Sequence, residues 1–461
     1  MTAATGRSTG EPRAGGGDAL LTDLYQLTML QVYHARWMTE EAVFDLFVRR
    51  LPESRNLLLA CGLEHALDYL EGLRFERSDL DYLERVGLFE DDFLSWLEDF
   101  RFTGDVYAVP EGTPVFANEP LLEIVAPLPE AQLVESYVMS QVHFATVAAS
   151  KALRVVTAAR GRRVVDFGMR RMHGRDAALK AARAFHIAGV DATSNVLAGK
   201  LYDLPVAGTM AHSFIQAHDS EPAAFRDFAA TYPETVLLVD TYDTLDGVRN
   251  VVRLAEVLGP EFRVRGIRLD SGDLDELAKA SRQILDEAGL DRVEIFASGS
   301  LDEHEVERLV ESGAPITGFG VGTRMGVSSD APSLDMAYKL TEYAGRGRLK
   351  LAPGKRILPG KKQVFRSERD GRAVGDAIAL VDEDLPGRPL LRKVMERGRR
   401  LAAASPSLRE LRAHARSELD GLPPGLFALR PAEPPYPVSI STRLEAYARE
   451  VAAEATAQET A

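Results

Sequence analysis

Residues 164–215 have the sequence VVDFGMRRMHGRDAALKAARAFHIAGVDATSNVLAGKLYDLPVAGTMAHSFI, and this stretch decides the fold. It contains three short apolar runs, VVDF, AGVDA and PVAGTMA, and each run ends in polar residues. Parallel strands that lead into a catalytic edge have this pattern, because both of their faces are buried and polar side chains follow their ends. The stretch therefore predicts about two β–α units with functional side chains behind their strands.

The alternation of strand and helix continues beyond this stretch with a steady spacing. Predicted strands end at Asp166, Asp191, His212, Asp240, Asp270, Ser298 and Gly322, and predicted helices cover 177–188, 222–230, 245–258, 274–288 and 302–312. Repeated β–α units predict a parallel sheet, either closed into a barrel or doubly wound. We favour the barrel because polar residues follow nearly every strand, whereas a doubly wound sheet gathers its site at one switch point. The visible strands are fewer than a full barrel needs, so we expect an α/β fold built on an irregular, incomplete barrel of the TIM type.

Three regions flank this catalytic barrel domain, which we place at residues 151–340. Residues 1–17 lack the apolar segment of a signal peptide and are expected to form a flexible lead-in. Residues 18–150 predict an N-terminal α+β domain. Residues 341–461 contain Gly- and Lys-rich turns between short strands, which predicts a small antiparallel appendage with a frayed tail.

Within the N-terminal domain the patterns predict four features. A helix begins near Thr22, whose side chain is placed to cap it. VFDLFVRR, residues 43–50, alternates like a half-buried strand, and 106–127 has the turns of a three-stranded meander. A mostly apolar pattern over 133–157 predicts a long helix that leads into the barrel domain.

Composition excludes several function classes. The formal net charge of −14 argues against a nucleic-acid or anionic-membrane partner, because both favour a positive protein surface. Cys61 is the single cysteine, so an intrachain disulfide is impossible and a cysteine zinc site is not expected. No run approaches the roughly 20 apolar residues of a membrane span. We therefore expect a soluble, multidomain protein of a reducing compartment, with a cytoplasmic location.

Two glycine-containing turns follow the last two predicted strands. FASGS, residues 296–300, contains Gly299, and ITGFGVGTRMG, residues 316–326, contains Gly320, Gly322 and Thr323. Glycines let backbone N–H groups approach a phosphate closely, and the threonine adds a hydroxyl donor. Each cluster alone is better explained as a tight turn. Two in tandem at the end of a barrel where phosphates commonly bind favour a phosphate site.

His212, in GTMAHSF, is the candidate for a chemical role. A lone histidine among apolar residues is more often structural, but this one follows a predicted strand between Thr209 and Ser213. Arg268, at a strand end in RLDSGDL, is best explained as a bidentate ligand for a carboxylate or a phosphate. Arg170, in DFGMRR beside Arg171, allows the same interpretation, although one of the two could be a surface charge.

Aspartates in the same segments have two possible roles. Asp240 and Asp243, in VDTYDT, could hold Mg²⁺ or contact ribose hydroxyls, or they could cap the following helix. One of Ser271 and Asp273 is expected to cap the helix after RLDSGDL. These observations together predict a barrel enzyme for a phosphorylated, anionic substrate, with His212 central and arginines binding negative charge. They do not select the reaction.

At these residues the chain resembles the nicotinate phosphoribosyltransferase family. The resemblance extends from TDLYQLTM at Thr22 to AYKL at Ala337, and PGKKQVFR near Pro359 also fits. The segments FGMRR, DATSNVLAG, GTMAHSF, LVDTYDT, RLDSGDL and GVGT are specific in combination, although each alone is weak. The resemblance implies an irregular α/β barrel and an N-terminal domain that closes the active site of the partner subunit in a homodimer.

The resemblance also implies a reaction. The family condenses nicotinate with 5-phosphoribosyl 1-diphosphate to nicotinate mononucleotide and pyrophosphate, coupled to ATP hydrolysis with Mg²⁺. His212 would then carry the phosphohistidine, and Thr323 would bind the 5-phosphate together with the turns at Gly299, Gly320 and Gly322. The residues implied at nicotinate are Tyr25, Arg170, Thr209 and Arg268, and those implied at Mg²⁺-diphosphate or ribose are Asp240 and Asp270.

Three alternatives remain open. Another pyridine phosphoribosyltransferase could act on nicotinamide or decarboxylate quinolinate, although the AHS histidine together with DATSNVLAG disfavours both. A barrel lyase or isomerase for a phosphorylated sugar would need a Schiff-base lysine at a strand end or a carboxylate pair, and the strands show no such lysine. A phosphate-sensing protein without catalysis would bind ligand and never turn over.

Overall fold

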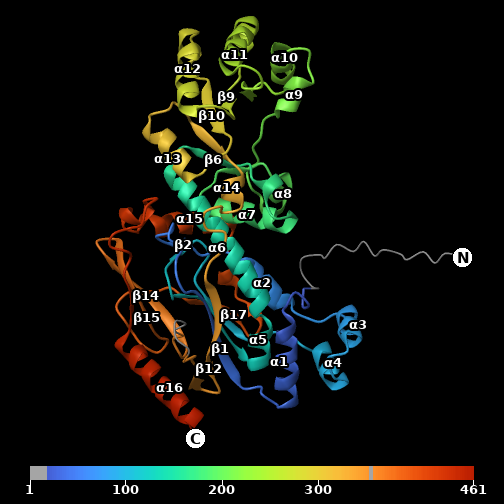
Figure 1. Ribbon diagram of the computed structural model, residues 1–461, viewed down its shortest axis with the longest axis vertical. Helices are drawn as coiled ribbons and strands as arrows, with labels where there is room; N and C mark the ends of the chain where they lie inside the picture. The colour runs from blue at the N-terminus through green and yellow to red at the C-terminus, as the bar shows by residue number, and fades with distance from the viewer. Residues whose placement is uncertain (1–17, 352–356, 461) are drawn as a thin grey trace, which may run out of the picture.

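The computed structural model describes residues 18–351 and 357–460 and shows an elongated α/β molecule in two halves (Figure 1). The N-terminal elements are α1 (Leu24–Ala35), β1 (Glu41–Val48), β2 (Leu58–Leu59), α2 (Leu63–Gly72), α3 (Arg77–Val86), α4 (Asp91–Glu98), β3 (Asp105–Ala108), β4 (Pro114–Val115), β5 (Pro120–Pro127), α5 (Leu128–Leu133) and α6 (Glu135–Ala158). Helix α6 runs between the two halves and contributes to both hydrophobic cores, with Val138 in one and Val155 in the other. The long helix predicted from the apolar pattern is confirmed.

Residues distant in sequence complete the sheet of the first half. Its strand order is β13-β12-β1-β5-β3-β17-β18, with β12 (Met336–Tyr343), β13 (Arg346–Gly347), β17 (Arg392–Glu396) and β18 (Arg399–Arg400) supplied by the C-terminal part of the chain. The side chains of β1 from Ala42 to Val48 are buried, because α5 packs against one face and Lys362 pairs with Asp45 on the other, so the expectation of a half-buried strand is wrong. The meander is also wrong: β3 pairs directly with β5, while β4 pairs with β2 elsewhere.

A six-stranded parallel sheet forms the centre of the second half. Its order is β7-β6-β11-β10-β9-β8, with β6 (Arg163–Asp166), β7 (Ala192–Thr193), β8 (Val236–Leu238), β9 (Gly266–Leu269), β10 (Glu294–Ser298) and β11 (Gly318–Val321). The helices of this half are α7 (Arg175–Ile187), α8 (Val196–Tyr202), α9 (His212–Gln216), α10 (Glu221–Thr231), α11 (Thr244–Leu258), α12 (Leu274–Glu287), α13 (Glu303–Glu311) and α14 (Thr323–Gly326). The α/β class and the five predicted helices are confirmed.

The strand predicted to end at His212 does not form. Val206 makes one isolated bridge to Thr193, and His212 begins α9 instead. Val206 is 57% exposed, so this apolar run has no partner layer to bury it and cannot add a strand. The described sheet therefore has β7 and β8 at its two edges and stays open between them.

The last part of the chain packs against both halves. The hairpin of β14 (Lys362–Arg369) and β15 (Arg372–Leu380) is antiparallel, as predicted, and β16 (Arg388–Pro389) extends it. β19 (Val438–Ile440) joins β15 in parallel, which the antiparallel expectation missed. Helix α15 (Leu408–Asp420) packs on α7, and α16 (Thr442–Thr460) packs on β15.

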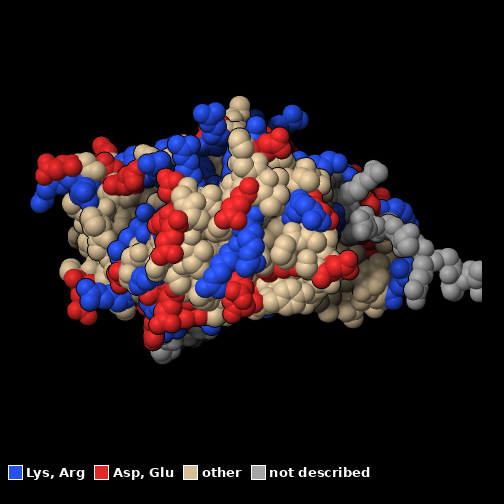
Figure 2. All heavy atoms as spheres, turned by 90° about the horizontal axis from the view of Figure 1, so that it is seen from above, with Lys and Arg blue, Asp and Glu red and all other residues tan. Residues whose placement is uncertain are grey.

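The surface charges are mixed. On the face shown in Figure 2, Lys and Arg side chains alternate with Asp and Glu side chains over short distances. In the part of the chain that the structure describes, no helix combines the length and apolar character needed to cross a bilayer.

Candidate active site

The carboxyl ends of the parallel strands meet at one edge of the second-half sheet. Because all six strands run in the same direction, the turns that follow β6, β8, β9, β10 and β11 lie at that edge. Turns in this position carry catalytic residues in α/β folds. The sequence-predicted residues Asp240, Asp270, Gly299 and Gly322 follow four of these strands.

Arg268 lies in β9 with its guanidinium turned toward the segment before α9. Its Nη1 donates to Thr209 Oγ1 at 3.0 Å, and its Nη2 donates to the Met210 carbonyl at 3.0 Å. Its Nε is buried and has no hydrogen-bond partner among the described residues. Burial lowers the pKa of Arg268, while Asp270 and Asp240 oppose that shift and Arg170 adds to it. A cation held by a hydroxyl and a carbonyl, with a buried N–H left over, is prepared to bind an anion.

His212 begins α9 beside the same arginine. Its Nδ1 lies 3.1 Å from Thr241 Oγ1, and its Nε2 lies 3.8 Å from Asp270 Oδ2. The side chains of His212 and Asp270 are 38% and 37% exposed, so solvent and substrates can reach both. Thr241 therefore orients the imidazole, whose other nitrogen faces Asp270 and which stays accessible, as a reactive group must be.

Asp240 and Asp270 form an acidic pair at this edge. Asp240 Oδ2 accepts hydrogen bonds from the Asp270 backbone N–H at 2.8 Å and from Ser271 Oγ at 2.7 Å. Asp240 Oδ1 is buried and has no hydrogen-bond partner among the described residues. Asp270 in turn accepts a hydrogen bond from Ser298 Oγ.

The carboxylate oxygens of Asp240 and Asp270 supply part of the ligand set that Mg²⁺ usually has. Mg²⁺ is usually held by one or two carboxylates together with substrate phosphates and water, and an unpartnered carboxylate oxygen beside a second carboxylate matches that pattern. Within 18–351 and 357–460, no group of three or more His, Cys, Asp or Glu side chains forms a metal cage. The pair suits a Mg²⁺ ion that arrives with a phosphorylated substrate.

The two glycine turns are shaped by close backbone packing. A Cβ at Gly299, whose φ is +94°, would lie 1.8 Å from the Asp270 carbonyl oxygen. A Cβ at Gly320 would lie 2.4 Å from the Phe167 ring, and one at Gly322 would lie 3.3 Å from the Phe167 carbonyl oxygen. Glycine is therefore needed at Gly299 and Gly320 for packing. The exposed Thr323 follows directly, where its hydroxyl can meet a ligand.

Two predicted residues stand apart from this group. Arg170 is exposed on the short helix η1 (Met169–Arg171), and its charge reaches Arg268. Tyr25 lies on α1 and is 49% exposed. Figure 1 shows α1 in the lower half of the molecule and β9 in the upper half, so one chain does not bring Tyr25 to Arg268.

Several helix-capping roles are resolved by the contacts. Asp243 caps α11 and Asp273 caps α12 through side-chain hydrogen bonds to backbone N–H groups. α1 follows Asp23 rather than Thr22, because Thr22 Oγ1 donates to the Leu133 carbonyl at 3.4 Å. The prediction of a Thr22 cap is wrong, since that hydroxyl is used to fasten the chain to α5.

Sequence reasoning overlooked Phe167 and Thr241. The Phe167 ring packs against Gly320 and lies 6.0 Å from the Arg268 guanidinium carbon, which places an aromatic face beside the arginine. Thr241 orients His212. Their positions gave a signal, because Phe167 follows the strand-end Asp166 and Thr241 follows Asp240.

Comparisons with known proteins place this chain in one enzyme family. The family model described as the nicotinate phosphoribosyltransferase (NAPRTase) N-terminal domain matches residues 20–143, and the NAPRTase family model matches residues 162–374. A nicotinate phosphoribosyltransferase, pncB2, from Mycobacterium tuberculosis is 54% identical over 92% of this chain and 92% of its own length. A nicotinate phosphoribosyltransferase from Bacillus subtilis is 42% identical over 81% of this chain and 78% of its own length.

Solved structures extend the comparison. The crystal structure of human nicotinic acid phosphoribosyltransferase superposes with a TM-score of 0.83 at 30% identity, covering 93% of this chain and 99% of the human one. A nicotinate-nucleotide pyrophosphorylase from Pyrococcus furiosus superposes with a TM-score of 0.74 at 26% identity, covering 90% and 99%. Family models that cover both halves, and relatives above 30% identity over most of the chain, show that this chain belongs to the nicotinate phosphoribosyltransferase family.

Proposed function

We propose that this chain condenses nicotinate with 5-phosphoribosyl 1-diphosphate to give nicotinate mononucleotide and pyrophosphate, and that it couples the reaction to ATP hydrolysis. The family assignment supports nicotinate phosphoribosyltransferase activity in NAD biosynthesis. The observation that carries the proposal is Arg268, a half-buried cation with a free, buried Nε–H beside His212 and Asp270. The fold that we propose for this half is an irregular α/β barrel of the TIM type, open between β7 and β8.

Nicotinate would bind through its carboxylate. Arg268 offers its Nε–H and the second hydrogen on each Nη nitrogen, because one hydrogen of each Nη is used by Thr209 and Met210. Arg170 adds a second positive charge nearby. An arginine pair favours a carboxylate, whereas the amide of nicotinamide would call for an acceptor.

The phosphoribosyl diphosphate would bind on the glycine turns. Backbone N–H groups around Gly299 and Gly322, with the Thr323 hydroxyl, are suited to phosphate oxygens, while Gly320 lies inside β11 and makes room for the Phe167 ring. Asp240 and Asp270 are the residues that would hold Mg²⁺ with the diphosphate, and the ion would neutralise charge on the leaving group. The chain's own part is to hold C1 of the ribose near the nicotinate ring nitrogen.

The chemical step is glycosyl transfer. The nicotinate ring nitrogen forms a bond to C1 while the bond from C1 to the diphosphate oxygen breaks, with oxocarbenium character on the ribose. Arg268 would restrain the nicotinate, and the aspartate pair and the glycine turns would restrain the phosphoribosyl diphosphate, which reduces the entropic barrier.

ATP coupling would run through His212. The γ-phosphoryl group of ATP would pass to an imidazole nitrogen, forming an N–P bond as the bond to ADP breaks, and water would later cleave the N–P bond. Thr241 holds the ring through Nδ1, and Asp270 lies 3.8 Å from Nε2 on the opposite side. The added negative charge would reorganise the neighbouring diphosphate site, and its loss would reset that site.

The assembly that we propose is a homodimer with shared active sites. Tyr25 is exposed on α1, away from Arg268 of its own chain. Leu21, Leu24, Val32 and Trp37 on and beside α1 are also exposed, so this helix presents an apolar face. Tyr25 of the partner subunit would stack on the nicotinate ring in a cytoplasmic enzyme.

A substrate comparison tests the proposal. Purified protein is incubated with phosphoribosyl diphosphate and Mg²⁺ plus nicotinate, nicotinamide or quinolinate, each with and without ATP. The proposal is supported if product forms with nicotinate and with neither of the other two acceptors, and if ATP makes that reaction faster. Mononucleotide formed from nicotinamide or quinolinate reassigns the substrate, and binding without turnover identifies a sensor.

A further inference from the structure

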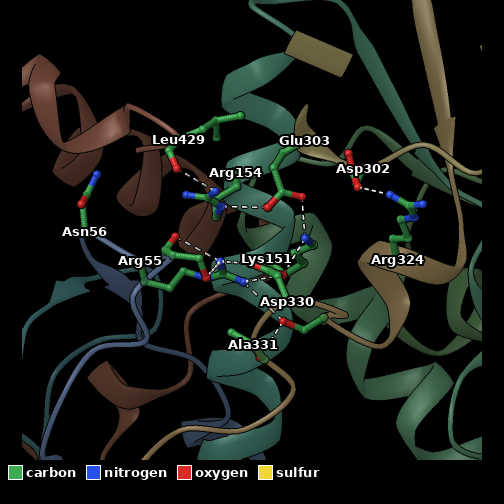
Figure 3. A network of polar contacts seen from close by, with 12 residues as sticks. Arg55, Asn56, Lys151, Arg154, Asp302, Glu303, Arg324, Asp330, Ala331 and Leu429 are labelled. Carbon is green, nitrogen blue, oxygen red and sulfur yellow. Dashed lines mark hydrogen bonds and ion pairs between the residues drawn. The ribbon is translucent and has the colours of Figure 1, made fainter. Parts of the chain in front are cut away.

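A buried ionic cluster fastens the phosphate-turn segment, residues 322–330, to helix α6. Lys151, in the middle of α6, donates to Glu303 Oε2 at 2.5 Å and to Asp330 Oδ1 at 2.7 Å (Figure 3). The Lys151 and Glu303 side chains are 2% and 0% exposed. The segment begins with Gly322 and Thr323. Its other end, Asp330, is bound to the buried Lys151.

Other parts of the chain converge on the same cluster. Arg55, from the loop after β1, donates from Nη1 to Asp330 Oδ2 at 2.5 Å and from Nη2 to Asp330 Oδ1 at 3.2 Å. Arg154, one turn beyond Lys151, donates to Glu303 Oε1 at 2.9 Å and to the Leu429 carbonyl at 3.2 Å. Both halves of the molecule therefore hold Asp330 and Glu303 in place (Figure 3).

The near end of the segment is fastened as well. One carboxylate oxygen of Asp302 caps α13. The other accepts a hydrogen bond from the guanidinium of Arg324, the residue after Thr323. Between the two attachments, Ser328 has a φ of +45°, in the left-handed region that non-glycine residues rarely adopt. Its hydroxyl donates to the Ala331 carbonyl at 2.8 Å, and Arg55 Nη2 lies 3.4 Å away. The segment is held in one conformation from both ends.

Stability alone does not explain this cluster. Removing a lysine and a glutamate from water carries a large desolvation cost, and apolar side chains of similar volume often stabilise a fold as well or better. Burial would raise the pKa of Asp330, but hydrogen bonds from Arg55 and Lys151 outweigh it and hold that pKa well below its usual range. The carboxylate thus stays charged and directional, which favours one geometry of the segment.

We propose that Lys151 is a positioning residue for phosphoribosyl diphosphate, acting through Asp330 to set the conformation of residues 322–330. The inference rests on the proposed function, in which Thr323 and Gly322 bind the 5-phosphate. It extends that function to residues that lie outside the site and touch no substrate. The hydrogen bonds of the Arg268 guanidinium go to Thr209 and Met210 and not to the cluster, so nicotinate binding should depend on the cluster much less.

Steady-state kinetics of five variants test the proposal. Lys151→Met and Asp330→Asn remove one charge each with little change in size, and the double variant tests whether both act through one contact. Arg160→Met is the matched control, because Arg160 also joins the end of α6 to α13, through Glu311, but with both side chains more than half exposed. Thr323→Val removes the hydroxyl assigned to the phosphate.

We expect Lys151→Met and Asp330→Asn each to raise the KM for phosphoribosyl diphosphate on the order of ten-fold, with the KM for nicotinate changed less than about two-fold. The double variant should be little worse than either single one, and Arg160→Met should behave as the unsubstituted protein. Equal rises in both KM values, or a loss of thermal stability with both KM values unchanged, would overturn the proposal.

Further outcomes distinguish a failure of this inference from a failure of the proposed function. Asp330 is 26% exposed, so Asp330→Asn remains a test if Lys151→Met does not fold, and an unchanged KM there also overturns the proposal. If Thr323→Val raises the KM for phosphoribosyl diphosphate while the cluster variants do not, this inference fails and the proposed function stands. If Thr323→Val has no effect on that KM, the proposed phosphate site itself is wrong.

Discussion

Arg268 is the residue that we propose selects the substrate of this protein. Its guanidinium is fixed by a hydroxyl and a carbonyl, and the Phe167 ring lies 6.0 Å away, so its direction is set before any ligand arrives. Preorganised N–H donors lose little entropy on binding and favour a planar anion. The carboxylate of nicotinate is such an anion.

Replacing Arg268 with Ala should raise the KM for nicotinate by roughly 10- to 100-fold, because a hydrogen-bonded charge pair contributes about 1.5–3 kcal/mol. The KM for phosphoribosyl diphosphate should change much less. Arg265→Ala is the control, since Arg265 precedes the same strand at its other end and pairs with Glu234 on the surface. A rise confined to the KM for phosphoribosyl diphosphate would reassign Arg268 to the diphosphate.

Residue types and spacing identified much of the candidate site. The fold brings four predicted residues to one edge of the parallel sheet: Arg268, His212, Asp240 and Asp270. Asp240 follows β8, Arg268 lies in β9 with Asp270 directly after it, and His212 begins α9 beside them. The contact partners Thr241 and Phe167 were missed, because a threonine and a phenylalanine have ordinary structural uses and only the folded neighbourhood selects them. Tyr25, on α1, lies in the other half of the molecule from β9, so a single chain does not bring it to Arg268.

Secondary-structure elements were predictable where their pattern is local. α11, α12 and α13 have an apolar face at helical spacing with an aspartate at each N-cap, and both signals lie within a few residues. The cover over a strand is not local. β1 is buried on both faces because α5 packs against one and Lys362 of β14, more than 300 residues later in the sequence, pairs with Asp45 on the other, which no short pattern reveals.

At the level of elements, α2 meets α7 and α8 around His65. Burial, and then the nearby charges of Arg183 and Lys180, lower the pKa of His65 to about 4. Its ring lies edge-on to Tyr202 of α8 at 6.5 Å, and Arg183 of α7 makes a bidentate ion pair with Glu111 beside it. The histidine is therefore neutral in the fold at pH 7.

This histidine should make stability depend on pH. Its folded pKa lies below its unfolded value, so the unfolded chain binds the proton more readily, and the stabilisation present above about pH 6.5 is lost as pH falls toward 4. Between pH 7 and pH 5 the loss should be roughly 2 kcal/mol, given one pKa unit per 1.36 kcal/mol.

Denaturant unfolding at pH 7, 6 and 5 measures this loss. His65→Gln should flatten the decline in the free energy of unfolding relative to the unsubstituted protein, and His304→Gln, at an exposed position of α13, should leave it unchanged. Parallel curves for the unsubstituted and His65→Gln proteins would show that His65 does not titrate in this window.

The whole molecule is organised by α6, which joins two cores and separates α1 from the catalytic edge (Figure 1). The apolar exposed face of α1 and the opposite location of Arg268 suit a two-fold dimer, in which each N-terminal half reaches the other chain's site. Each complete site would then need Tyr25 from one chain and Arg268 from the other.

Mixing two impaired variants, assayed at a nicotinate concentration well below the KM of Arg268→Ala, tests this arrangement. Tyr25→Ala and Arg268→Ala proteins, unfolded and refolded together, should regain about a quarter of the unsubstituted activity, because half of the random dimers then contain one intact site of two. Each variant refolded alone is the control. Activity no higher than that of the separate variants would show that each chain carries a self-contained site.

The most direct test of the account is the rate of nicotinate mononucleotide formation by the unsubstituted and His212→Ala proteins, each with and without ATP, at saturating nicotinate and phosphoribosyl diphosphate. We expect ATP to accelerate the unsubstituted protein, and the variant to form product slowly and at the same rate with or without ATP. The account would be contradicted if the unsubstituted protein formed no nicotinate mononucleotide, or if His212→Ala kept the full acceleration by ATP.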